Sequence, residues 1–551
     1  MKRRCSGITT VLIVTLLAGS IVWIMPSYAA EPPADRKVRK IEFAITTPAY
    51  DPIRNEWCLM VAENWKKLGI DVEIKPMDTS VMISQGLKKH DFDMMIVSWG
   101  GMPERIDPDY LLYTILDSSQ AGENLFNMDG YNNPEYDKMA RKQRVTMDPE
   151  ERRKAVFKAQ EIFVHDQPET PVVHQYFVHA YNSADFDGAV PMIGEGLSSR
   201  WNFVNMRPLG FQKILRYGHP ETIRTLNPMK MVGLHEYTVF RVIYDCLMAV
   251  DPEGKIVPWA AKEVKVVNDR TIEATLREGM KFHDGKPVTA DDVKFTFDYL
   301  LKWQIGEFLA GIKVLDAVEK TGPLSVRFKL KEPSSSFMAY ALASVYILPK
   351  HVWENVPEKV GLKHPDEWTD WKALAIGSGP FKFDYWRQGE EMKLVRNDGH
   401  FTKPKIEGIL RIDYKDMQTL SMALQKKEID VIGWNLSPLQ AKQLKGTKGI
   451  SVVTIPSFGL YPIHYNCRIK PFSDVAFRRA LGYCVPKKRI VDEFYEGYGV
   501  EAHSTIGPMN KYWHNPNVEK VDLDLEKARK ILKDAGYEWD SKGKLYYPKG
   551  R

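Results

Sequence analysis

The sequence predicts a mixed α/β protein whose chain forms two or three domains. Its 551 residues exceed what a single hydrophobic core usually supports. Strand-like and helix-like patterns alternate as far as Tyr181, and a second series of strands and capped helices begins near Phe211. The composition, with 44% hydrophobic and 27% charged residues, is that of an ordinary globular protein.

The first residues have the order of a secretory signal. Residues 2–4 are basic, an apolar run follows, and Ser27 and Ala29 supply small side chains at the spacing of a cleavage site. We expect cleavage after Ala29 or Ala30, so that residues 1–30 are a signal peptide and the product is periplasmic. The alternative is an uncleaved anchor, because the apolar run is nearly long enough to span a bilayer.

The segment that follows predicts a sheet covered by helices. Side chains alternate in polarity over 41–45 and 71–75, and 92–97 has the composition of a buried strand. Between these strands, apolar residues recur at helical spacing over 57–68 and 81–87. The resulting β-α-β-α-β order is typical of an α/β layer structure.

The clearest predicted helix of this part spans 148–166. Asp148 is suited to the N-cap, Pro149 to the first helical position, and the two glutamates that follow stabilise the positive end of the helix dipole. Further along, the Gly- and Ser-rich stretch 194–199 has no regular pattern. We therefore expect a module junction near residues 195–210.

The second part of the chain contains equally plain local signals. Residues 271–276 alternate as a strand, and Thr289 with the acids after it caps a helix. Asp474 caps a later helix, and a further helix over 525–535 ends at Gly536. These elements extend the α/β prediction to the end of the chain.

The charge and the cysteines give no support to two classes of site. The formal charge is +6, of which residues 2–4 contribute three, so the surplus does not argue for a nucleic-acid partner. The four cysteines after the signal form no CxxC pair, which leaves a zinc site unsupported. One disulfide is possible outside the cytoplasm, with Cys467 and Cys484 the nearest pair, and buried free thiols are the alternative. Cys5 precedes the apolar run, so the arrangement of a lipoprotein cysteine is missing.

A search for catalytic spacings points away from an enzyme. The sequence contains no HExxH, no GxSxG and no GxxxxGK[ST]. His165 closes a predicted helix, and His174 and His179 are five residues apart, so they face opposite sides of a regular strand. We expect no catalytic residue, no metal site and no cofactor.

From Phe211 onward, several motifs follow one another in the order of a known family. Leu226-Asn227-Pro228 precedes the segment 259–293, and 377–383 and 471–480 continue the series. These motifs resemble the extracellular solute-binding proteins of the peptide and nickel ABC transporter family, family 5, which includes oligopeptide- and dipeptide-binding proteins. The segment 259–293 is similar to the most recognisable signature of that family.

The segment 41–181 resembles the same family, but it resembles the part that normally comes last. The motifs 68–74, 98–101 and 130–135 belong to the family's C-terminal third. The end of this chain, 535–539, would ordinarily run straight into the strand that here begins near Val38.

The resemblance therefore implies a circular permutant. Residues 31–204 would be the family's C-terminal third, with one lobe and the hinge return. Residues 205–551 would be its N-terminal two-thirds, with the second lobe and an additional subdomain. A permutation is tolerated where the old termini lie close and the new break falls in an exposed turn. The alternative is a rearranged or truncated gene whose product folds poorly.

The resemblance also implies a two-lobed periplasmic-binding-protein-like fold whose lobes close over a ligand. Such a cleft combines aromatic side chains with a few hydrogen-bonding groups, because a buried ligand needs its polar groups matched. By position in the family, the candidate ligand-binding residues are Trp99, Met102, Asp107, Glu236, Tyr237, Ser378, Trp434, Asn435, Tyr461 and His464.

Several of these candidates have a purely structural alternative. Trp99 and Trp434 each end a predicted buried strand, where an indole packs well. His464 is equally explained as a hydrogen-bonded strand histidine. Asp107 fits a turn and helix cap better than a ligand anchor.

One departure from the family bears on the ligand. Relatives that bind peptides commonly carry an aspartate shortly after the strand that contains the tryptophan, where it pairs with the peptide's amino terminus. The corresponding positions here are Gly101-Met102-Pro103, although Glu104 or Asp107 could substitute. An unpaired buried charge is costly, so the missing aspartate favours a solute other than a peptide with a free amino terminus.

The resemblance implies a non-enzymatic, monomeric binding component of an ABC importer. It would capture a peptide or another small solute and deliver it to permease subunits in the membrane. The alternative is a binding module without transport, such as a sensor partner or a peptide holdase. Closure on a saturable ligand favours the first function, and weak binding of unfolded chains favours the second.

Overall fold

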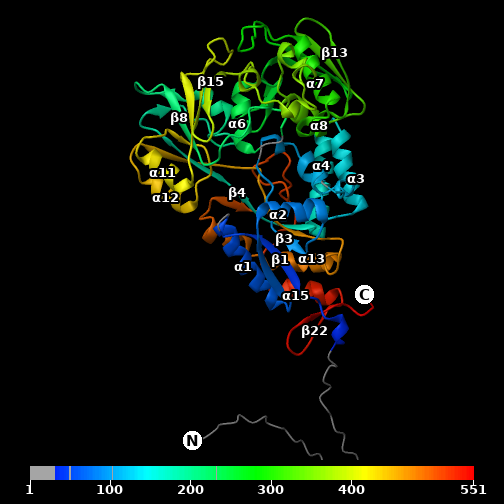
Figure 1. Ribbon diagram of the computed structural model, residues 1–551. Coiled ribbons are helices and arrows are strands. Elements are labelled where there is room, and N and C mark those ends of the chain that lie inside the picture. The colour runs from blue at the N-terminus through cyan, green and yellow to red at the C-terminus, as the bar shows by residue number, and fades with distance from the viewer. Residues whose placement is uncertain (1–31, 49–50, 102, 124, 231–232, 551) are drawn as a thin grey trace, which may run out of the picture.

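The computed structural model describes residues 32–48, 51–101, 103–123, 125–230 and 233–550. The chain forms two lobes, one built from the blue, cyan and orange-red parts of the chain and the other from its green and yellow parts (Figure 1). Each lobe has its own hydrophobic core. The predicted signal peptide lies outside the described residues. Within them, no helix combines the length and the apolar character needed to cross a membrane.

The first lobe comprises residues 32–175 and 461–550, and it is built on a six-stranded sheet. Its core joins both segments, since Phe43, Trp65 and Tyr465 are buried in one cluster. The strand order is β2-β1-β3-β20-β4-β21, with β1 parallel to β2 and β3, and with β20 antiparallel to β3 and β4. The strands are β1 (Ile41–Thr46), β2 (Val72–Met77), β3 (Met94–Met95), β4 (Glu169–Gln175), β20 (Tyr461–Tyr465) and β21 (Gly499–Glu501).

Helices cover this sheet, and a short C-terminal hairpin completes the lobe. The helices are α1 (Pro52–Lys67), α2 (Thr79–Ser84), α3 (Pro134–Val145), α4 (Pro149–Asp166), α13 (Val475–Gly482), α14 (Lys487–Arg489) and α15 (Leu525–Asp534). The hairpin is β22 (Glu538–Trp539) with β23 (Leu545–Tyr546). Short helical turns are η1 (Ala34–Arg36), η2 (Gln85–Lys89), η3 (Pro103–Ile106), η4 (Tyr110–Thr114), η5 (Ser118–Gln120) and η9 (Ile490–Phe494).

The second lobe comprises residues 177–455, and its main sheet has the order β15-β16-β17-β8-β18-β5-β19. These strands are β5 (Phe177–Asn182), β8 (Ile214–His219), β15 (Phe381–Arg387), β16 (Glu391–Arg396), β17 (Gly408–Asp413), β18 (Val431–Ile432) and β19 (Ile450–Ile455). Shorter pairs are β6 (Phe186–Asp187) with β7 (Arg207–Pro208), and β9 (Met248–Val250) with β10 (Ile256–Pro258). The helices are α5 (Arg200–Asn205), α6 (Leu234–Ile243), α10 (Trp371–Leu374), α11 (Met417–Gln425) and α12 (Pro438–Lys445), with the turns η7 (Glu358–Val360) and η8 (Pro365–Glu367).

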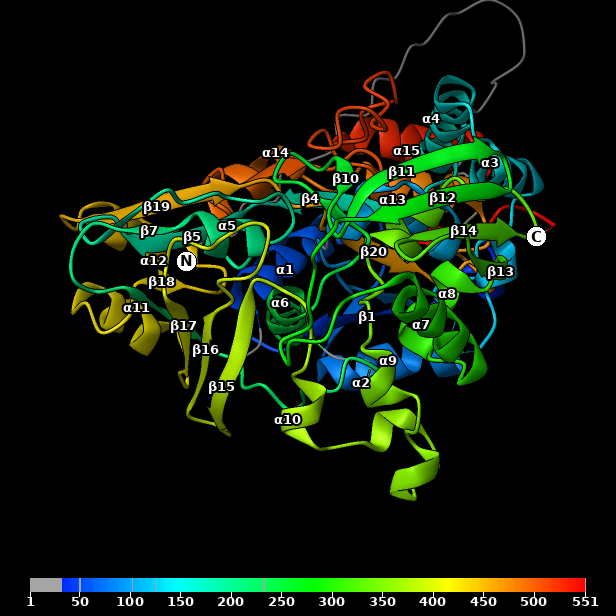
Figure 2. The ribbon, with the colours of Figure 1, turned by 90° about the horizontal axis from the view of Figure 1, so that it is seen from above.

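A subdomain extends the second lobe. It has an antiparallel sheet of order β11-β12-β14-β13, formed by β11 (Ala261–Asn268), β12 (Thr271–Leu276), β13 (Leu315–Lys320) and β14 (Ser325–Leu330). Its helices are α7 (Ala290–Lys302), α8 (Gly306–Ile312) and α9 (Lys350–Trp353), with the turn η6 (Met338–Leu342). Figure 2 shows this sheet and the seven-stranded sheet on opposite sides of the lobe, with α6 between them.

The lobes are interleaved along the chain. Within the described residues the chain passes from the first lobe to the second at Tyr176, between β4 and β5, and returns through 456–460, between β19 and β20. The lobe boundary at Tyr176 lies before residue 204, the expected end of the module that holds one lobe and the hinge return. His174 and His179, expected on one strand, lie on two strands that belong to different sheets.

Local signals were reliable guides to individual elements. Asp148 accepts a hydrogen bond from the backbone N–H of Glu151 (2.8 Å) at the start of α4, as predicted. Thr289 and Asp292 form the cap of α7. The prediction of a strand over 92–97 overestimated its length, because the regular pairing of β3 with β1 and β20 involves only Met94 and Met95.

Candidate functional site

A cavity of about 470 Å³ lies between the two lobes. Both lobes contribute to its walls, close to the two segments that join them. The lining residues from the first lobe are Asp51, Arg54, Gln175 and Tyr461, and those from the second lobe are Phe177, His179, Glu195, Ser198, His219, Glu221, His235, Thr238, Gly433, Trp434 and Asn435. A volume of this size is in the range of small-molecule sites.

The wall from the first lobe is held by the start of α1 and by the strand β20. Asp51 is the N-cap of α1 and accepts a hydrogen bond from the backbone N–H of Arg54 (2.9 Å). The guanidinium of Arg54 forms an ion pair with Asp51 (3.0 Å) and lies 4.4 Å from the centre of the Tyr461 ring. The Tyr461 hydroxyl donates to Gln175 (2.6 Å), so this wall is organised before any ligand enters.

The wall from the second lobe is built from α6 and from the ends of strands. His235 and Thr238 are three residues apart in α6, so they share one face of that helix. His219 ends β8, and its ring packs at 5.2 Å against the edge of Trp434. The amide oxygen of Asn435 accepts a hydrogen bond from the backbone N–H of Val178 (2.5 Å), which anchors the loop after β18.

Two of the cleft histidines are neutral, and one of them has a defined tautomer. Burial lowers the pKa of His179 to about 3 and holds the pKa of His219 well below its ordinary value. The Nδ1 atom of His179 accepts from the backbone N–H of Leu197 (3.0 Å), whereas Nδ1 of His219 lies within hydrogen-bond distance of both the backbone N–H (2.9 Å) and the carbonyl oxygen (3.2 Å) of Glu221. Because Nδ1 of His179 is an acceptor, its Nε2 carries the proton and is a hydrogen-bond donor.

The carboxylates of the cleft differ in their partners. Asp51 is paired with Arg54, and Glu195 is paired with Arg241. Glu221 is exposed and has no ion-pair partner among the described residues. The cleft therefore offers a ligand one open carboxylate, the neutral imidazole donor of His179 and the aromatic faces of Phe177, Trp434 and Tyr461.

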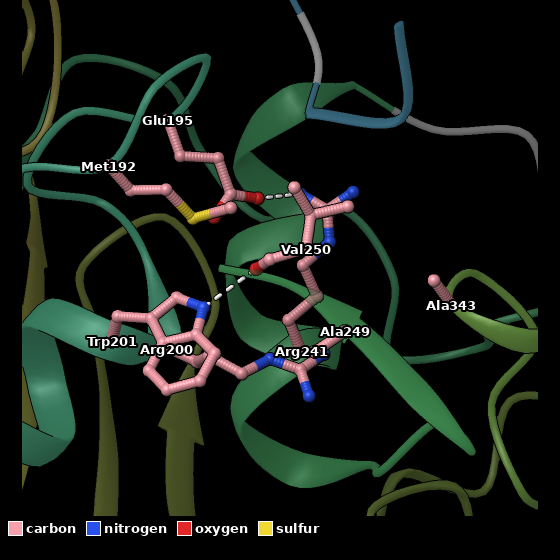
Figure 3. A pocket seen from close by; sticks show the side chains of 8 residues that line it. All are labelled: Met192, Glu195, Arg200, Trp201, Arg241, Ala249, Val250 and Ala343. Atoms are coloured by element: carbon pink, nitrogen blue, oxygen red, sulfur yellow. Dashed lines mark hydrogen bonds and ion pairs between the residues drawn. The ribbon is translucent and has the colours of Figure 1, made fainter. Parts of the chain in front are cut away.

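A second, much smaller cavity shares Glu195 with the cleft. Its volume is about 20 Å³, enough for about one water molecule. Figure 3 shows its lining, with the carboxylate of Glu195 joined to Arg241 and the Trp201 indole donating to the carbonyl of Val250 (2.8 Å). Because this cavity is too small for a solute, the larger cleft is the candidate ligand site.

The structure places three of the ten predicted site residues in the wall of the cleft. These are Trp434, Asn435 and Tyr461. Met102 lies outside the described residues, so its position carries no structural statement. The other six are packed elsewhere, where protein groups already engage their polar atoms.

Three of these six have structural roles in the second lobe. Glu236 caps α6 through the backbone N–H of Gly233 (3.1 Å) and pairs with His235 (2.8 Å). Burial raises the pKa of the Glu236 carboxyl, but the bonds from His235 and from backbone amides outweigh it and leave the pKa below its ordinary value. The Tyr237 hydroxyl donates to Glu307. Ser378 is buried and donates to Asp245 (2.8 Å).

The remaining three are buried in the first lobe. Asp107 forms a two-pronged ion pair with Arg152, with N–O distances of 2.7 and 2.9 Å. Trp99 packs edge-on against His464, with ring centres 5.5 Å apart. The Nδ1 atom of His464 lies 3.1 Å from carboxylate oxygens of both Asp129 and Glu169.

Sequence reasoning missed most of the second lobe's wall. In α6 it selected Glu236 and Tyr237, whereas the cleft is lined by His235 and Thr238. The spacing of three residues between a histidine and a threonine was the available signal, since such residues share a helix face. Glu195 and His219 had no comparable signal, because their relation to the cleft depends on how distant strands pack.

The described cysteines are all free thiols. Cys58, Cys246 and Cys484 are buried, and Cys467 is partly buried. Cys467 and Cys484, the pair nearest in sequence, are therefore not joined. Burial raises the pKa of Cys246 to about 11, so its thiol stays protonated.

Comparison with known proteins assigns the chain to a family. A family model described as bacterial extracellular solute-binding proteins, family 5, matches residues 28–123 and 255–550. Among curated proteins, the oligopeptide-binding protein AppA of Bacillus subtilis is 31% identical over 303 residues, which cover 54% of each chain. The dipeptide-binding protein of Escherichia coli is 29% identical over 310 residues, which cover 52% of this chain and 56% of that protein.

A solved structure agrees on the fold. A periplasmic oligopeptide-binding protein from Thermotoga maritima matches with a TM-score of 0.50 and 24% identity, covering 60% of this chain and 65% of that one. The chain spans about half the length of the curated relatives it matches. Because the family model matches well over half of the sequence, the chain belongs to the bacterial extracellular solute-binding proteins of family 5.

Proposed function

We propose that this protein is the periplasmic substrate-binding component of an ABC importer. It captures a small solute between its lobes and delivers it to permease subunits in the membrane. The observation that supports this function best is the 470 Å³ cleft, which is lined by both lobes. The cleft lies beside the two segments that connect the lobes within the described residues. Hinge closure about two such segments is a common mechanism of ligand capture.

The lining of the cleft indicates the chemistry of the ligand. Glu221 is an acceptor for a cationic or hydrogen-bond-donating group, and the Nε2–H group of His179 suits a ligand acceptor. Phe177, Trp434 and Tyr461 suit an apolar or planar part. A short peptide has these features, as do other small polar solutes, and the relatives compared above are named for oligopeptide and dipeptide binding.

We also propose that the chain is a circular permutant of its family. The family model matches two separate segments, and the last described residues lie beside the first. The backbone N–H of Val38 donates to Leu545 (2.9 Å), and that of Tyr547 donates to Arg36 (2.7 Å). A chain whose ends meet in this way can be joined there and opened elsewhere with little change in its core.

Native mass spectrometry of the full chain purified from its own periplasm tests the function. We expect one small molecule bound per chain, and its loss in Trp434→Ala, because Trp434 lines the cleft. Trp386→Ala is a matched control, since Trp386 is also partly buried in the second lobe but packs against Trp371 (5.0 Å) away from the cleft. Small-angle scattering should report a more compact protein when the released molecule is added back.

Two results would contradict the proposal. Weak binding of many unfolded chains without compaction would indicate a holdase. Hydrolysis of the bound molecule would indicate an enzyme.

A further inference from the structure

Three side chains that are distant in sequence meet in the interior of the first lobe. Asp129, Glu169 and His464 are at most 1% exposed, and their nearest ligand-type atoms all lie within 4.8 Å of one another. Glu169 begins β4 and His464 lies on β20, where the two residues face each other across the antiparallel pair. None of the three lines the cleft between the lobes.

The hydrogen bonds of His464 determine which ring nitrogen faces the carboxylates. Its Nε2 atom lies 3.1 Å from the backbone carbonyl of Val97, so Nε2 carries a proton and donates. Its Nδ1 atom faces the carboxylates, at 3.1 and 3.2 Å from the two oxygens of Asp129 and at 3.1 Å from one oxygen of Glu169. A metal-binding histidine is typically held in this way, with its second nitrogen bonded to a backbone carbonyl.

The cluster is not neutral when both carboxylates are ionised. One imidazolium would then leave one negative charge in excess in the interior, which is costly. Oε1 of Glu169 has no hydrogen-bond partner among the described residues, and Oε2 receives only a long bond from the Trp99 indole (3.4 Å) in addition to His464. Arg468 is attracted by Asp129, but its guanidinium donates to the carbonyls of Met128 and Ala121.

We propose that Asp129, Glu169 and His464 bind one divalent transition-metal ion inside the first lobe. The ion replaces the proton on Nδ1, so that two carboxylates and a neutral imidazole balance its charge. Bonds of about 2.0 to 2.2 Å separate neighbouring ligand atoms of a tetrahedral site by roughly 3.3 to 3.6 Å, only slightly more than the N–O distances seen here. Oε1 of Glu169 has no hydrogen-bond partner among the described residues, so it is available as a further ligand atom.

A bound cation would relieve the repulsion between the two buried carboxylates. The ion would connect β4, β20 and the loop of Asp129. Because none of its ligands lines the cleft, this site is structural and not part of solute capture.

The test uses the full chain, stripped of metal with a chelator and then titrated with Zn²⁺. We expect one Zn²⁺ per chain, a higher Tm in the presence of Zn²⁺, and an anomalous difference peak at bonding distance from His464 Nδ1 in Zn²⁺-soaked crystals. Glu169→Gln and Asp129→Asn keep the side-chain shape but remove a charged ligand, and each should weaken Zn²⁺ binding at least about tenfold.

Two control variants locate the ion. His174→Gln changes a histidine of equal burial on the same strand as Glu169, and it should bind Zn²⁺ like the parent. His219→Gln changes a cleft histidine, and it should also bind Zn²⁺ like the parent. Loss of binding in His219→Gln with full binding in Glu169→Gln would place the ion in the cleft and overturn the proposal.

The absence of stoichiometric Zn²⁺ binding by the parent would also overturn the proposal. The anomalous map of the parent decides the question even if the substitutions prevent folding. A peak elsewhere, or none, refutes the site. These readouts do not depend on the solute, so they leave the proposed transport function untouched in either case.

Discussion

Replacing Asp107 with alanine should destabilise the fold without weakening ligand binding. Asp107 and Arg152 are each 5% exposed, and both guanidinium Nη atoms of Arg152 donate to the carboxylate of Asp107. The substitution leaves the guanidinium buried without its counter-charge. It also removes the acceptor for the backbone N–H of Asp109 (2.9 Å).

The size of the effect follows from what Arg152 retains. Removing one partner of a buried ion pair usually costs about 3 to 5 kcal/mol. Gln143 still accepts from Nη2 of Arg152 (2.9 Å) and from Nε (3.1 Å to its carbonyl), and the Trp513 ring lies 4.8 Å from the guanidinium. These contacts place the expected loss near the lower end, at about 3 kcal/mol. The double substitution Asp107→Leu with Arg152→Met should recover most of it, because neither charge then remains buried alone.

Urea unfolding followed by circular dichroism measures the stability of the parent and the variants. Calorimetric titration with the co-purified solute measures the affinity of the parent and the variants for that solute. It is carried out without urea, at a temperature at which all of these proteins are folded. The reasoning is refuted if the free energy of unfolding of Asp107→Ala lies within about 0.5 kcal/mol of that of the parent while its affinity for the solute falls. That result would make Asp107 a ligand contact and not a partner of Arg152.

Three further substitutions have expected outcomes. Trp434→Ala should weaken solute binding by about 2 kcal/mol in calorimetry and leave urea stability near that of the parent; equal affinity would remove Trp434 from the binding wall. Ser378→Ala should cost about 1 to 3 kcal/mol of unfolding free energy, because Asp245 loses a buried hydrogen bond, and a change in affinity instead would contradict its placement. Burial lowers the pKa of Lys487 to about 7 from 10.5, so between these pH values the unfolded chain binds a proton that the folded chain does not. Parent stability should therefore rise with pH over that range more steeply than stability of Lys487→Met, and equal slopes would show that Lys487 stays charged when folded.

Single elements of this fold were predictable where their determinants lie close together in the chain. The start of α4 follows from Asp148 and Pro149, since an N-cap bond spans three residues. The strand β12 was expected over its observed bounds, because its alternating side chains reflect one buried and one partly exposed face. The order of the family motifs was also readable from the sequence, since each motif is a short local segment.

The placement of the site was less predictable. Three predicted residues reach the cleft, yet Asp107 has its carboxylate taken by Arg152, which lies 45 residues away. The break of the expected strand at Tyr176, which sends β4 and β5 into different lobes, has no local sequence signal. In both cases the outcome depends on partners that folding brings from elsewhere.

By itself, the sequence determined that this protein is a mixed α/β member of a solute-binding family, with capped helices and alternating strands at identifiable positions. Those properties arise from backbone hydrogen bonds and side-chain periodicity over a few residues. Only the tertiary structure decided which side chains face the cleft, which carboxylates are already paired, and that Asp129, Glu169 and His464 meet in one buried cluster. Contacts between segments hundreds of residues apart depend on which strands pair and how the lobes pack, and a short stretch of sequence does not name its distant partner.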